Sequence, residues 1–157
     1  MIYFGLRHIK GVGTKECEKI KGIGDVSKYS WMDCITKIIH PLKINKRAAI
    51  AMISVGAFSG INNKDSRRKM LYEFDSWKQL SAREQSAIVE NQEDKSVKSE
   101  SLAEAISVLI KNTKINSRRI ETVVNIQNSL KNPFYDLSDH AVSIATHENK
   151  FLGCSLT

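Results

Sequence analysis

Two glycines separated by a single residue, Gly11 and Gly13, are the part of this chain whose residue types and spacing best fit a ligand site. They stand between the apolar run 2–6 and a stretch of helical character over 15–21. Glycines allow a turn so tight that its backbone N–H groups stay uncovered, and the next helix directs the positive end of its dipole to the same place. Such a site would suit a phosphate group.

The residues around the glycines are typical of a helix-hairpin-helix. Lys10 and Lys15 flank the turn, and Cys17 and Ile20 recur at helical spacing as the packed face of the following helix. A helix-hairpin-helix contacts the DNA backbone without reading the bases. An ordinary turn between two helices is the alternative, because glycine is common there too and a lone G-x-G is a weak motif.

The contacts expected of this first hairpin come from one continuous segment: Lys10, Gly11, Val12, Gly13, Thr14 and Lys15. If bare backbone approaches the phosphate at Gly13, valine there should block the approach. It should also force a disfavoured backbone conformation and cost roughly 1–3 kcal/mol in folding.

Charge is concentrated in the same third of the chain. The net charge is +7, from 24 Lys and Arg against 17 Asp and Glu. Residues 1–50 hold ten basic and four acidic residues, so they carry +6 and the remainder carries +1. Positive charge concentrated around the hairpin is expected of a surface that binds nucleic acid. The alternative is a lysine-rich face that contacts only solvent.

Length and composition exclude several classes of protein. A chain of 157 residues with 41% apolar content can bury one sizeable core or two small ones. No apolar run approaches the roughly 20 residues of a membrane span, and the N-terminus lacks the order of a signal peptide. Three cysteines without C-x-x-C pairing indicate a reducing, cytoplasmic setting. His140 and His147 could share a helix face, but without cysteines or a third ligand nearby no zinc site or other cofactor is expected.

Capping residues before apolar-periodic runs predict an all-α chain. Internal repetition is limited to Ile9–Gly13, echoed by Ile20–Gly24, where Gly22 reads as a helix C-cap. A domain boundary is expected near 60–64, which gives a helix-hairpin-helix unit over 1–62 and a small helical domain over 63–157 with a polar loop at 92–99. A helix is expected from Ser30 to His40, where Pro41 ends it, and another over 46–55, with Asn45 as its cap and Gly56 at its end. Further helices are expected over 65–80, from Ser81 onward, and over 101–111, 116–131 and 138–152.

Several strings resemble the bacterial C-family replicases, the α subunit of DNA polymerase III and its phage-encoded relatives. The strings are Phe4–Leu6, Ile9–Gly13, Asn45–Arg47, Met52–Phe58 and Phe151–Leu156, in the same order and at similar spacing. The similarity is close over residues 2–60 and at the C-terminus, and weak over 61–137. It implies a tandem helix-hairpin-helix that holds the duplex leaving the active site and leads through helices toward an OB-fold domain.

The resemblance places a second hairpin at Pro41–Asn45, which lacks the glycine pattern. Its phosphate contacts would come from Lys43, Asn45, Lys46 and Arg47 at the start of the next helix. Family members also commonly carry a short sliding-clamp peptide of glutamine, aliphatic and aromatic residues. The nearest strings, 79–83 and 127–131, lack the aromatic residue and read as helix surface, so no clear motif supports contact with a clamp.

The resemblance also implies what this chain lacks. Catalysis in the family needs palm-domain aspartates that hold two magnesium ions, and these would precede Ile2 in a full polymerase. No Asp-x-Asp and no phosphate-binding P-loop occurs in the sequence. The expectation is a non-catalytic, duplex-DNA-binding segment of a replicative DNA polymerase, with the rest of the polymerase as partner. The abrupt start suggests a fragment or one piece of a split gene.

Two other classes remain as alternatives. A free-standing helix-hairpin-helix protein of repair or recombination would share the first sixty residues, but would have no reason to end in the C-terminal string. A nuclease or glycosylase with an appended hairpin would need a carboxylate cluster or a catalytic lysine in a cleft.

Overall fold

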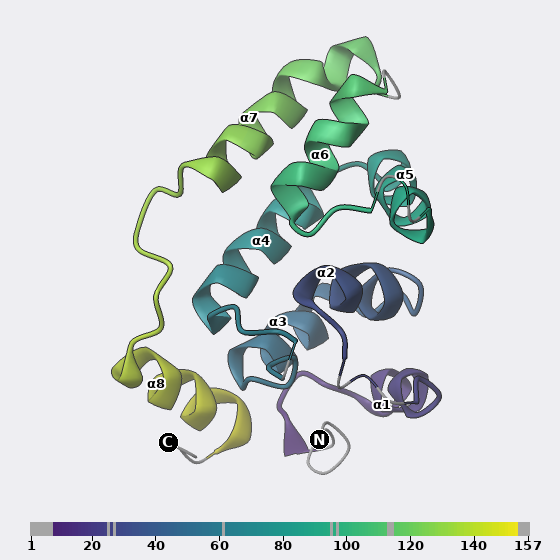
Figure 1. The fold of residues 1–157 in the computed structure, drawn as a ribbon. Coiled ribbons are helices and arrows are strands. Elements are labelled where there is room, and N and C mark those ends of the chain that lie inside the picture. The colour runs from purple at the N-terminus through teal and green to yellow at the C-terminus, as the bar shows by residue number, and fades with distance from the viewer. Residues whose placement is uncertain are drawn as a thin grey trace. The chain divides into compact units, whose positions relative to one another are not determined.

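The computed structural model of this chain describes residues 8–24, 26, 28–60, 62–94, 96, 98–112 and 115–153. All regular structure in these ranges is helical, so the predicted all-α class is confirmed for them (Figure 1). The elements are α1 (Thr14–Lys21), α2 (Trp31–Asp33), the π-helical η2 (Cys34–Ile39), α3 (Lys46–Ser54), α4 (Arg67–Gln79), α5 (Ala82–Glu93), α6 (Leu102–Lys111), the 3-10 turn η3 (Ser117–Arg119), α7 (Ile120–Lys131) and α8 (Ala141–Leu152).

The chain forms two compact units. The first contains Met1–Leu71 and Leu137–Thr157, and the second contains Tyr72–Asp136. The division falls inside α4, later than the boundary near 60–64 that the sequence suggests, and the C-terminal helix belongs to the first unit. Long-range contacts account for this difference, because α8 packs against α3 and Glu148 accepts a hydrogen bond from Arg67 at 3.0 Å.

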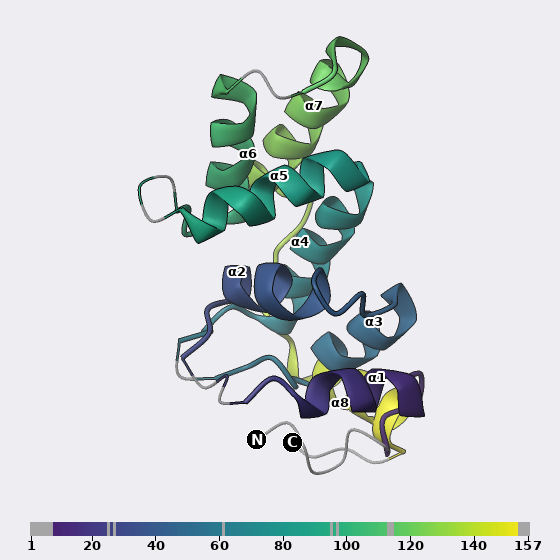
Figure 2. The ribbon, with the colours of Figure 1, turned by 90° about the vertical axis from the view of Figure 1, so that its right-hand side faces the viewer.

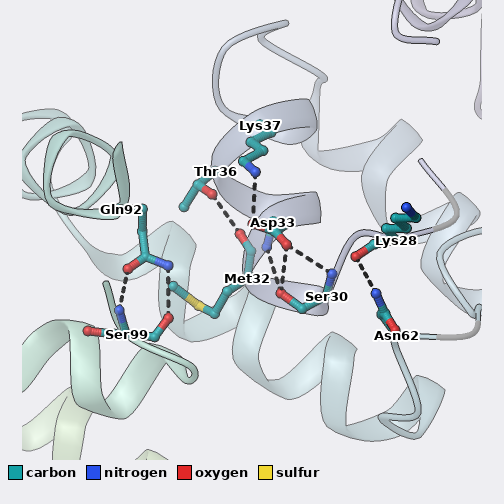
Figure 3. A network of polar contacts seen from close by, with 9 residues as sticks. All are labelled: Lys28, Ser30, Met32, Asp33, Thr36, Lys37, Asn62, Gln92 and Ser99. Atoms are coloured by element: carbon teal, nitrogen blue, oxygen red, sulfur yellow. Dashed lines mark hydrogen bonds and ion pairs between the residues drawn. The ribbon is translucent and has the colours of Figure 1, made fainter. Parts of the chain in front are cut away.

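A capping box begins α2 in the first unit. The Ser30 hydroxyl accepts from the Asp33 N–H at 3.2 Å while Asp33 accepts from the Ser30 N–H at 3.1 Å, which is the capping box predicted there (Figure 3). Further along, the Thr36 hydroxyl donates to the Met32 carbonyl at 2.8 Å. A hydroxyl on that carbonyl competes with the regular ladder, and the helix continues in π form up to His40.

Apolar side chains of these helices form the core of the first unit. Trp31 packs on Phe58 with ring centroids 5.9 Å apart, and Ile35, Met52 and Ile53 are fully buried. The apolar face of α3 is therefore part of this core.

The second unit contains α5, α6 and α7, with α6 packed against both neighbours. Ser81 and Glu84 form the predicted capping box of α5, and the Ser101 hydroxyl caps α6. The polar loop predicted over 92–99 begins only after Glu93, where α5 ends. Gln92 lies in α5 and is buried, and its carboxamide exchanges two hydrogen bonds, of 2.7 and 2.9 Å, with the backbone of buried Ser99 (Figure 3).

Two further expectations about helix surfaces and ends need correction. Gln127 is buried, and its amide donates to the Ala103 carbonyl and the Ser107 hydroxyl, so the string 127–131 is not simply helix surface. The last helix begins at Ala141 rather than at 138. Asp139 instead accepts from the backbone N–H groups at the start of α4.

No helix in the described part of the chain is both long and apolar enough to cross a membrane.

Candidate nucleic-acid interface

The first hairpin is a tight turn that leads directly into α1. The Val12 N–H donates to the Ile9 carbonyl at 3.1 Å, and Gly11 has φ +100°, a region that other residues avoid. Gly13 is the N-cap of α1 and brings no side chain to cover the helix end. The N–H groups of the first turn therefore have no capping side chain. The helix expected before this hairpin falls on residues 1–7, outside the described residues.

The conformations of the two glycines correct one prediction. Gly13 has φ −86° and ψ 176°, an extended conformation open to any residue, and a Cβ built there meets nothing within 4 Å. The strain predicted for a substitution at Gly13 is therefore wrong. It belongs to Gly11, where a built Cβ would lie 3.4 Å from Cγ of Arg47.

The second hairpin lies where the resemblance places it, between η2 and α3. Lys43 has φ +52°, the left-handed conformation that a glycine would adopt without strain. Asn45 caps α3, with its side-chain oxygen accepting from the Ala48 N–H at 2.8 Å. The Lys46 and Arg47 N–H groups precede the first bonds of this helix, and both side chains are exposed.

The two hairpins repeat one backbone pattern. Each has a left-handed residue, then a buried aliphatic residue, then an N-cap in extended conformation. The helix then begins with two exposed residues, of which the second is basic. The paired positions are Gly11 and Lys43, Val12 and Ile44, Gly13 and Asn45, and Lys15 and Arg47. The echo Ile20–Gly24 suggested by the sequence is not this repeat. Gly22 is the C-cap of α1, as predicted.

Helices α1 and α3 follow these hairpins and lie side by side (Figures 1 and 2). A side chain of each helix contacts the hairpin that precedes the other helix. The Arg47 side chain of α3 lies over Gly11, and the Lys19 amine of α1 donates to the Lys43 carbonyl at 2.9 Å. Glu16 of α1 accepts from the Asn45 amide at 3.1 Å. The two hairpins therefore form one structural site.

The structure brings the ten predicted contact residues together in the first unit. Eight of them are exposed: Lys10, Gly13, Thr14, Lys15, Lys43, Asn45, Lys46 and Arg47. Gly11 is partly covered. Val12 differs, because its side chain is buried and its N–H is used inside the turn, so it shapes the hairpin and offers no free donor.

Residues far along the chain also hold the site, and sequence reasoning did not assign them. The Lys10 N–H donates to the Phe151 carbonyl at the end of α8, at 2.7 Å. Glu16 is 5% exposed, although a glutamate in a first helical turn usually reads as a surface residue.

The titrating groups near the site do not suggest a nucleophile. Burial, with a smaller effect from the neighbouring Asp33 charge, raises the pKa of the Cys34 thiol to about 12. A thiol with such a pKa stays protonated at neutral pH and is inert. No group of three or more His, Cys, Asp or Glu side chains placed to hold a metal occurs among the described residues.

Comparison with known families gives a match for this part of the chain. A family model described as a helix-hairpin-helix motif covers residues 1–71. The helix-hairpin-helix predicted from the two glycines is therefore confirmed. The match ends at Leu71, which is also the last residue of the first unit's N-terminal segment, Met1–Leu71. Searches of curated proteins and of solved structures give no match to the chain.

Proposed function

We propose that this chain holds duplex DNA by its phosphate backbone, without reading the sequence, through its two helix-hairpin-helix hairpins. The observation that carries this proposal is the repeated hairpin. Twice, a helix N-terminus lies beside exposed basic side chains: α1 has no side-chain cap, and the Asn45 cap of α3 takes only the Ala48 N–H. Direct contacts join the two sites. Helix N-termini and lysine ammonium groups both bind phosphate oxygens, which are the same at every base pair.

The test is DNA binding measured over a range of salt concentrations. Purified chain should bind duplexes of unrelated sequence with equal affinity, and log K should fall against log salt with a slope of roughly −2 to −4. Lys10→Ala with Lys15→Ala should reduce the slope by about one unit per lost contact, since exposed lysines contribute little to folding. Strong preference for one sequence, or wild-type affinity in the folded double variant, would contradict the proposal.

We further propose that this DNA-holding unit serves a C-family replicative DNA polymerase. The strings that carry the resemblance support this proposal because they come from both ends of the chain and meet in one unit, where Lys10 bonds to Phe151. The rest of the polymerase, with the magnesium ions of its palm, would then be the partner. Palm aspartate motifs in the reading frame upstream of Met1, or in an adjacent gene, would support this context. Neighbouring repair genes alone would favour a free-standing repair or recombination protein.

The chain by itself should be catalytically inactive. We expect no primer extension at any magnesium concentration, because the sequence has no paired aspartates to hold two metal ions. Incorporation of nucleotides that survives repurification of the chain would contradict this expectation.

A further inference from the structure

We propose that Glu16 is a positioning residue that builds the second hairpin's phosphate site from the opposite helix. The inference rests on the proposed DNA binding. Glu16 lies in the first turn of α1, yet its contacts are with the second hairpin. Its Oε1 accepts from Nδ2 of Asn45 at 3.1 Å and from Nζ of Lys19 at 3.2 Å.

These contacts fix the orientation of the Asn45 side chain. A carboxamide has a donor end and an acceptor end, and only one orientation places the oxygen on the helix. With Nδ2 held by Glu16, Oδ1 points at the Ala48 N–H, 2.8 Å away. The carboxamide thereby covers the third N–H group of α3 and leaves the first two, those of Lys46 and Arg47, open to an anion.

The same carboxylate also orders the turn before the cap. Lys19 donates to Glu16 and, at 2.9 Å, to the carbonyl of Lys43. Lys43 is the residue in the left-handed conformation, which costs a non-glycine residue about 1–2 kcal/mol. A bond to its carbonyl supports this conformation in the absence of the glycine found in the first hairpin.

A negative charge is otherwise unfavourable beside a phosphate site, and the burial of Glu16 is consistent with a structural task. Its side chain is 7% exposed, and Oε2 is buried without a hydrogen-bond partner in the described structure. Glu18, on the same helix, is exposed and forms only a surface pair with Lys21 at 3.4 Å. Glu18 is therefore a matched control for the loss of one charge.

The experiment compares Glu16→Gln with Glu16→Met. Both variants remove the charge and keep the length of the side chain, but only glutamine can still accept a hydrogen bond from Asn45. Glu16→Gln and the control Glu18→Gln should bind duplex DNA at least as tightly as wild type, because each removes a repulsive charge. Glu16→Met should bind roughly tenfold more weakly. The salt slope should change little, because the N–H groups that lose their phosphate contact are neutral and the slope reports cationic contacts.

Melting temperatures and circular dichroism establish that the proteins are folded at the assay temperature. Equal affinity of Glu16→Met and Glu16→Gln would overturn the positioning role and leave DNA binding itself intact. Absence of binding in wild type would instead overturn the proposed function.

A second variant approaches the same contact from the other side and does not depend on the folding of Glu16→Met. Asn45→Ser keeps a good helix cap, but its shorter side chain cannot reach Glu16 while it caps the helix. We expect weaker DNA binding with little change in melting temperature. Wild-type affinity in Asn45→Ser would also overturn the inference.

Discussion

At the scale of single residues, the two glycines of the first hairpin have separate tasks. Gly11 is required by the backbone, because its φ of +100° is closed to other residues and the Arg47 side chain lies above it. Gly13 is in an ordinary extended conformation with open space around it. What glycine provides at position 13 is the absence of a side chain over the helix N-terminus.

This difference predicts opposite effects of Gly13→Ser on stability and binding. Serine is a slightly better N-cap than glycine, so the free energy of unfolding should stay the same or rise by a few tenths of a kcal/mol. Its hydroxyl would cover an N–H group that we assign to phosphate, so DNA affinity should fall severalfold. Thermal unfolding and fluorescence anisotropy with labelled duplex measure the two effects, and unchanged affinity would speak against a backbone phosphate site.

Gly11→Ala, in contrast to Gly13→Ser, is expected to lower the stability of the fold. A side chain at this backbone conformation should cost about 1–2 kcal/mol of folding free energy. For a chain of this size, the melting temperature should then fall by several degrees. A stable Gly11→Ala protein would mean that the turn differs from the one described.

At the scale of elements, side chains that end helices also connect them. In the second unit, Glu84 caps α5 with Ser81 and receives the Arg119 guanidinium at 3.0 and 3.2 Å. Burial alone would raise the pKa of Glu84, but the hydrogen bonds from Arg119 and Ser81, together with the Arg119 charge, lower it. One carboxylate thereby joins α5 to the start of α7.

The lowered pKa predicts a loss of stability in acid. A carboxyl whose pKa is lower in the folded state stabilises the protein above its unfolded pKa, and that contribution is lost as pH falls through the folded value. Glu84→Gln should cost about 2 kcal/mol at pH 7, and the difference from wild type should shrink toward pH 3. Urea unfolding at pH 7, 5 and 3 tests this, with the exposed Glu90→Gln of the same helix as control. A difference that does not depend on pH would refute the assignment.

At the scale of the whole molecule, the first unit is made from both ends of the chain. The carboxylate of Asp139 accepts from the Arg67 and Arg68 N–H groups, and buried Glu148 pairs with Arg67. The carbonyl of Phe151 holds the Lys10 N–H beside the first glycine. The C-terminal helix is therefore part of the unit that carries both hairpins.

Removal of this helix should impair both folding and binding. A chain that ends at Asp136 loses the ion pair of Glu148 with Arg67 and the packing of α8 against α3. We expect a lower melting temperature, faster hydrogen exchange at the Lys10 N–H and weaker DNA binding. The exposed substitution Val142→Ser in α8 should change none of these. Wild-type hydrogen exchange at Lys10 in the truncated chain would show that α8 does not hold the hairpin.

The sequence by itself determined the helices and the first hairpin, because these depend on neighbouring residues. Capping boxes at Ser30 and Ser81, the Asn45 cap and the tight turn at Gly11 are local signals, and each has the expected structure in the described residues. Only the tertiary structure decided the contacts between distant segments, such as the return of α8 to the first unit. It also revealed that Lys43 occupies the position of Gly11 in a second copy of the hairpin, and that Glu16 belongs to that copy. No local pattern encodes these contacts, since their energy arises from side chains that meet only after the chain has folded.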